Sequence, residues 1–110
     1  MMPDLTYVAG KYEAAVEALA IGDGRIQERI YDAAVASYGF PNPTGLPDDI
    51  RDRIDVLHTY LTKYPAQGDE GAYRATLARI HKSTGVKIAA LIVEIAARLR
   101  DAVECEVRGK

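Results

Sequence analysis

The sequence predicts a single all-α domain, covering residues 1–110, built as a bundle of four to five helices with a long apolar C-terminal helix. Three observations favour this class. A chain of 110 residues has the length of one domain. Its apolar residues recur at spacings of three or four, as on one face of a helix. No alternating run rich in Val, Ile and Thr lies between hairpin turns, as a strand would require.

The first expected helix covers residues 6–21, where apolar side chains repeat at helical spacing. Gly10 lies inside this run and weakens the first turn. Gly22 is expected to end the helix in the left-handed conformation, which glycine adopts without a Cβ clash. The residues expected to face inward are Val8, Tyr12, Ala15, Val16 and Leu19.

The second expected helix covers residues 24–38, with Asp23 as its N-cap and Gly39 ending it as Gly22 ends the first. The short connection predicts an antiparallel helical hairpin. Residues 40–46 contain two prolines and predict a loop inside the domain, with both ends anchored to the core. The inward residues of the helix and the two anchors are Ile26, Ile30, Ala33, Ala34, Phe40 and Leu46.

The third expected helix begins with Pro47 and is stopped by Pro65. Three aspartates follow Pro47 and place negative charge at the positive end of the helix dipole. Its apolar positions give the clearest amphipathic pattern in the chain. They are Ile50, Ile54, Leu57, Leu61 and Tyr64.

Residues 66–71 predict a turn, and residues 72–82 a fourth helix with Tyr73, Leu77 and Ile80 inward. The sequence at 83–85 predicts a break, with Ser83 or Thr84 as the N-cap of a last helix over 86–107. Ten of the twelve residues at 86–97 are apolar, and they do not fall on one stripe. A helix of this kind must be covered nearly all round, by its own bundle or by a second copy.

This apolar helix carries the leading functional hypothesis: a small non-enzymatic protein–protein interaction or regulatory module that pairs with itself as a homodimer. Burying a Leu, Ile or Val side chain contributes about 1.5–3 kcal/mol, so two or three left exposed would drive association. A symmetric dimer would pair the same surface on both copies. The residues expected at this contact are Ile88, Leu91, Ile92, Ile95 and Leu99.

The alternative is a nucleic-acid-associated regulator with a nonstandard basic helix surface around residues 74–87. The net charge of −2 gives no overall attraction to a polyanion, so such binding needs a local patch. Arg25 and Arg29 open the second helix and would offer a separate anion contact. A third alternative is a small-molecule pocket between helices, lined by some of the seven tyrosines. The basic residues of the patch are Arg74, Arg79, Lys82 and Lys87.

The sequence offers no catalytic, cofactor-binding or metal-binding motif. Two histidines and one cysteine give too few ligands at helical spacing for a metal site. No serine lies in a Gly-x-Ser-x-Gly motif, which would present it as a catalytic nucleophile. The single Cys105 fits a reducing compartment, and the N-terminus lacks a secretory signal, so a cytoplasmic location is expected. Glu94 interrupts the apolar stretch: either it marks a narrow solvent-facing window, the favoured alternative, or it is buried with a basic partner.

Overall fold

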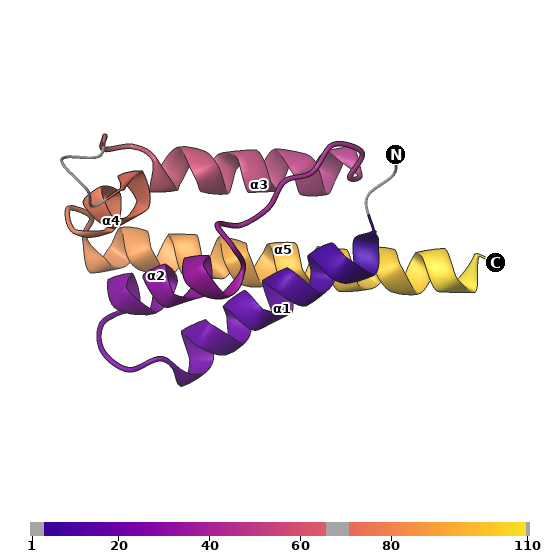
Figure 1. Cartoon of the computed structure of the whole chain (residues 1–110), viewed down its shortest axis with the longest axis horizontal. Helices are drawn as coiled ribbons and strands as arrows, with labels where there is room; N and C mark the ends of the chain where they lie inside the picture. The colour runs from indigo at the N-terminus through magenta and orange to yellow at the C-terminus, as the bar shows by residue number, and fades with distance from the viewer. Residues whose placement is uncertain (1–3, 66–70, 110) are drawn as a thin grey trace.

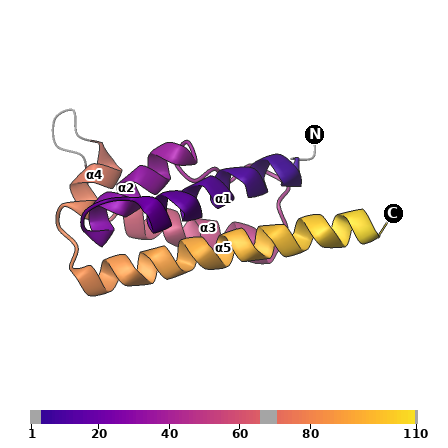
Figure 2. The same cartoon turned by 90° about the horizontal axis from the view of Figure 1, so that it is seen from below.

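A computed structural model describes residues 4–65 and 71–109, and over these residues the chain is all-α, as the sequence predicts. Helix α5 lies between α3 on one side and α1 and α2 on the other (Figure 1). Turned by 90°, the molecule shows α5 along one side, with the other helices all on the opposite side (Figure 2). The described helices are α1 (Leu5–Ile21), α2 (Ile26–Ala36), α3 (Asp48–Leu61), α4 (Ala72–Leu77) and α5 (Lys82–Arg108).

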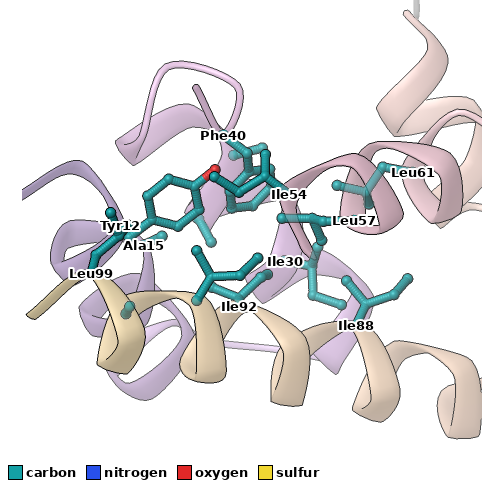
Figure 3. Close-up of a cluster of buried hydrophobic side chains, with 14 of the residues drawn as sticks. Tyr12, Ala15, Ile30, Phe40, Ile54, Leu57, Leu61, Ile88, Ile92 and Leu99 are labelled. Carbon is teal, nitrogen blue, oxygen red and sulfur yellow. The ribbon is translucent and has the colours of Figure 1, made fainter. Parts of the chain in front are cut away.

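One hydrophobic core joins α1, α2, α3 and α5 with the loop between α2 and α3 (Figure 3). Tyr64 lies beyond the end of α3 and is not part of this core, but the other inward positions predicted from the periodicity of the first three helices are buried or packed against it. Phe40 and Leu46 anchor the two ends of the loop, which confirms the predicted anchoring. Helical periodicity therefore locates the core, because each helix buries the stripe that its sequence makes apolar. Fully buried members include Tyr12, Ile30, Ile54, Leu57, Ile92 and Leu99.

Gly22 ends α1, but not in the predicted left-handed conformation. Its φ is −62° and its ψ is 149°, which is extended backbone. A Cβ at this position would lie 2.6 Å from the carbonyl oxygen of Ala18 and 2.7 Å from Cγ of Arg29. Glycine is needed here because α2 comes close to the end of α1, not because the backbone turns left-handed.

Helix α2 is shorter at both ends than the sequence predicts. Arg25 rather than Asp23 occupies the N-cap position, and its side chain makes no capping hydrogen bond. Gly24 has a φ of +93°, so the turn continues past Asp23 and delays the helix. At the other end, Tyr38 and not Gly39 is the left-handed residue that follows the C-cap Ser37, with a φ of +56°. Gly39 comes next with a φ of +86°, and its N–H donates to the carbonyl of Ala34.

Helix α3 ends at Leu61, well before Pro65, and Pro47 precedes its first residue instead of forming it. The Thr62 hydroxyl donates to the carbonyl of His58 at 2.7 Å and closes the last turn. The chain then leaves the helix so that the backbone N–H and C=O of Tyr64 can both bond the Thr76 hydroxyl of α4. The turn predicted at 66–71 lies outside the described residues except for its last position.

Helices α4 and α5 correct the predicted position of the break. Helix α4 ends at Leu77, and α5 begins at Lys82, so the chain turns at 78–81 and runs as helix through 83–85. Neither Ser83 nor Thr84 is an N-cap, because His81 occupies that position. Gly85 lies within α5, where a Cβ would stand 2.9 Å from Cγ2 of Ile26. The glycine thus permits close packing of α5 on α2 and is not a helix breaker here.

Candidate interaction surfaces

The structure places most of the predicted contact residues of the last helix inside a single copy. The side chains of Ile88, Ile92, Ile95 and Leu99 have no exposed surface and contribute to the shared core. Leu91 is half-buried and packs against the edge of that core. These four buried side chains are covered by α1, α2 and α3, because they share the stripe of α5 that faces the bundle.

The opposite stripe of α5 carries exposed apolar residues. In Figure 2, α1, α2 and α4 lie on one side of the α5 ribbon. Val86 is 52% exposed and Val93 is 48% exposed, and Ala90 between them is also exposed. Spacings of four and three residues put these side chains on one line of the helix surface. We call Val86, Ala90 and Val93 the outer face of α5.

A cluster of charged side chains joins α5 to α3 beside this face. Glu94 accepts hydrogen bonds from Nε of Arg53 at 2.7 Å and from Nε of Arg98 at 3.2 Å. Arg98 also pairs with Asp49 at 3.1 Å. The hydrogen bonds from Arg53 and then Arg98 lower the pKa of the Glu94 carboxyl. Glu94 is exposed to solvent, which confirms the favoured sequence-based alternative, and it pairs with two arginines without being buried.

The basic residues predicted to form one surface contact different elements. The guanidinium of Arg74 lies 4.4 Å from the ring centroid of Tyr31 on α2. Arg79 donates to the carbonyl of Ala75 at 2.7 Å and lies over the Tyr64 ring beyond the end of α3. Lys82 and Lys87, exposed on α5, complete the predicted set of basic side chains.

The two arginines predicted to hold an anion also make contacts within the chain. Arg29 donates to the carbonyl of Leu19 at 3.3 Å and so satisfies one of the free carbonyls at the end of α1. Arg25 forms an exposed ion pair with Glu28 on the first turn of α2. Only the contact of Arg29 joins α2 to α1, because the pair of Arg25 and Glu28 lies within the start of α2.

The loop after α2 is held by hydrogen bonds from three different helices. The Tyr73 hydroxyl of α4 donates to the carbonyl of Gly39 at 2.9 Å. Nε2 of His58 on α3 lies 2.6 Å from the carbonyl of Phe40. The Tyr12 hydroxyl of α1 donates to the carbonyl of Pro41 at 3.0 Å. Three successive carbonyls are thereby satisfied, which fixes the path of a loop that has no regular structure.

The two tyrosines in this network stay protonated over a wide pH range. Burial, and then the neighbouring Tyr73 phenol, raise the pKa of the Tyr12 phenol far above its usual value. Burial also raises the pKa of Tyr73. The Phe40 ring lies between them, with centroids 6.1 Å from Tyr12 and 6.3 Å from Tyr73. Both hydroxyls therefore act as permanent donors to the loop at physiological pH.

Sequence reasoning missed a surface rich in tyrosine on α1, α2 and α4. Its residues connect through cation–π contacts between side chains and through a shared groove of about 600 Å³. A signal for it exists in the sequence, because Tyr31, Val35 and Tyr38 follow the spacing of one helical face. We call this surface the tyrosine face. Its members are Tyr7, Lys11, Tyr31, Val35, Tyr38 and Arg74.

A second groove, of about 880 Å³, lies between the C-terminal half of α3 and the joint of α4 and α5. Tyr60 and Tyr64 line it beside Ile80 and Thr84. Tyrosines thus line grooves between elements, as the small-molecule alternative requires. No such ligand is assigned by this geometry alone.

Within residues 4–65 and 71–109, no helix is long and apolar enough to cross a membrane. In the same residues, no three His, Cys, Asp or Glu side chains gather where they would hold a metal ion. The chain matches no known protein family, no curated protein and no solved structure at a significant level.

Proposed function

We propose that this protein is a non-enzymatic helical module that works by contact with other proteins, most simply by pairing with a second copy. One observation carries the proposal: the outer face of α5 exposes about half of Val86 and of Val93. The contact therefore uses the stripe of α5 opposite the buried residues Ile88 and Ile92. Covering these valines removes apolar surface from water, which favours association.

The spacing of charges on α5 suits an antiparallel pair. Lys87 and Glu94 are seven residues apart, which is about two helical turns, so they lie on the same side of the outer face. If a twofold axis crosses α5 near Ala90, Lys87 of each copy faces Glu94 of the other. Lys87 forms no ion pair within the described part of the chain. The same axis brings Val86 of one copy near Val93 of the second copy, as an isologous contact requires.

Sedimentation equilibrium of the full chain tests this pairing. We expect the average mass of the wild-type chain to rise with concentration towards that of a dimer. Val93→Glu places a charge within the contact and should weaken the association by about tenfold or more. Glutamate favours helix, so the change should leave far-UV circular dichroism as in the wild type.

A matched control comes from Val107→Glu, which alters an exposed valine near the end of the same helix. This variant should associate as the wild type does. A wild-type chain that stays monomeric at high micromolar concentration would exclude self-pairing. Equal weakening by both substitutions would show that added charge, and not loss of the outer face, causes the effect.

The nucleic-acid alternative gains no support from the arrangement of the predicted patch. Arg74 and Arg79 contact rings on different elements, so the structure does not unite them into one basic surface. Neutralising several phosphates requires such a surface. Self-pairing is accordingly the better-supported proposal.

A further inference from the structure

The tyrosine face exposes more large apolar surface than its surroundings. Tyr38 is 79% exposed, and Tyr7 and Val35 are each 62% exposed. Scattered single residues of this kind are normal, but a contiguous group marks a contact site. Tyrosine and arginine are also the side chains enriched where binding energy concentrates in protein interfaces.

Cation–π contacts and a shared groove make these residues contiguous. Nζ of Lys11 lies 5.0 Å from the ring centroid of Tyr7 and 4.0 Å from that of Tyr38, so one cation joins two rings. Tyr38, Val35 and Tyr31 then line the same groove of about 600 Å³. Arg74 also lines this groove, with its guanidinium over the Tyr31 ring. The face thus combines an aromatic groove with two cations, Arg74 in the groove lining and Lys11 over the Tyr38 ring.

Both cations contact rings instead of carboxylates. Among the described residues, neither Lys11 nor Arg74 forms an ion pair. A cation held over an aromatic ring keeps its charge available to a further anionic group. A partner complementary to this face therefore carries one carboxylate for Lys11, one for Arg74, and an apolar group between them.

The backbone holds Tyr38 in place on this surface. Tyr38, Gly39 and Phe40 have φ values of +56°, +86° and +61°, a conformation that bulky residues rarely adopt. It persists because the hydrogen bonds from Tyr73, His58 and Tyr12 fix the loop, and because Phe40 is fully buried. A backbone fixed before binding loses less entropy when a partner arrives.

We infer that the tyrosine face binds a segment of another protein that carries a large apolar side chain between two carboxylates. The apolar side chain enters the groove between Tyr31 and Tyr38, and the carboxylates pair with Lys11 and Arg74. A single-stranded nucleic acid also stacks on aromatic rings, but it needs a groove of positive charge along its backbone. Two separated cations on a chain of net charge −2 fit two carboxylates better.

This inference is independent of self-pairing, because no residue of the tyrosine face belongs to α5. A random peptide library displayed on phage, selected on the immobilised full chain, provides the probe. We expect the selected sequences to place Phe, Leu, Met or Trp between acidic residues. A synthetic peptide of that consensus should bind in solution, as measured by fluorescence anisotropy.

Two substitutions then test the two components of the site. Tyr38→Gly removes the ring while suiting the positive φ, so it should weaken peptide binding by about tenfold or more without unfolding the chain. Lys11→Glu should weaken binding similarly, and a peptide with lysine in place of one acidic residue should restore it. Lys82→Glu, a charge change at an exposed site outside the face, should bind as the wild type does.

Three results would overturn the inference. The first is failure to select any peptide, or selection of sequences without acidic residues. The second is binding that Tyr38→Gly and Lys11→Glu leave unchanged. The third is displacement of the peptide by poly-uridine RNA, which would assign the face to single-stranded nucleic acid.

Discussion

At the residue scale, the side chains that fix the fold most specifically are donors aimed at the loop after α2. Tyr12 is wholly buried, yet its hydroxyl reaches the carbonyl of Pro41. The Tyr73 hydroxyl, on the six-residue helix α4, donates to the carbonyl of Gly39. A loop with two prolines has few N–H groups of its own, so these side chains supply the donors that its carbonyls need.

Tyr12→Phe should destabilise the chain at neutral pH and become harmless at alkaline pH. Loss of the hydrogen bond costs about 1 kcal/mol at neutral pH. Burial raises the pKa of Tyr12 in the folded chain above its unfolded value near 10. The contribution of Tyr12 to the free energy of unfolding is therefore complete below about pH 10 and decreases progressively as the pH rises further. Above this pH the free energy of unfolding of the wild-type chain falls by about 1.4 kcal/mol per pH unit because of Tyr12. The Tyr12→Phe chain has no phenol at this position and does not undergo this fall.

The wild-type chain and the Tyr12→Phe variant should therefore have equal free energies of unfolding at about pH 11, as measured by urea titration. Tyr73 is present in both and affects them alike. A constant difference between the chains from neutral pH to about pH 11 would contradict the predicted titration of Tyr12.

At the element scale, glycine has different roles inside two helices. Gly10 lies in α1 with no atom within 4 Å of the position of a Cβ. Gly85 lies in α5, where the same Cβ would meet Ile26 of α2. The sequence predicts a weak first turn at Gly10 and a break between helices at Gly85, but the structure has both inside helices, and only Gly85 is required by packing.

Alanine at these two positions should have opposite effects on stability. Gly10→Ala should raise the free energy of unfolding by about 0.5–1 kcal/mol, because alanine loses less backbone entropy in a helix. Gly85→Ala gives the same gain in helix propensity, but the new Cβ is forced against the stiff, β-branched side chain of Ile26, which costs about 1–3 kcal/mol. Its net effect should be destabilising. Equal stabilisation by both substitutions in thermal or urea unfolding would contradict the close contact between α2 and α5.

At the scale of the whole molecule, α5 joins the bundle into one cooperative unit. Its buried stripe contacts α1, α2 and α3, and the described residues span 47 × 27 × 21 Å. The exposed side of the same helix remains available for contact between molecules. One helix can serve both purposes because its two apolar stripes face opposite directions.

Adjacent residues of α5 should therefore differ sharply when replaced by alanine. Ile92→Ala leaves a cavity in the core and should cost about 2–5 kcal/mol. Val93→Ala removes a half-exposed side chain and should change stability by less than about 1 kcal/mol. Far-UV circular dichroism and tyrosine fluorescence should follow one coincident transition in both variants. Separate transitions would mean that the helices do not share a single core.

Much of this fold follows from the sequence alone, because helical periodicity is a local property. The spacing of Ile50, Ile54, Leu57 and Leu61 determines which side of α3 is buried. The prolines and glycines after α2 likewise indicate a loop whose anchors are Phe40 and Leu46. A candidate surface is partly visible too, in the helical spacing of Tyr31, Val35 and Tyr38.

Tertiary structure alone decided the remaining features, because they depend on residues that are distant in sequence. A nearly all-apolar segment does not reveal which of its sides the bundle will cover, so only the neighbours of α5 separate buried Ile88 from exposed Val86. The role of Gly85 depends on Ile26, and the link from Tyr7 to Tyr38 depends on Lys11 lying between them. Periodicity sets what each helix can bury, and the packing of one helix on another determines what it leaves for a partner.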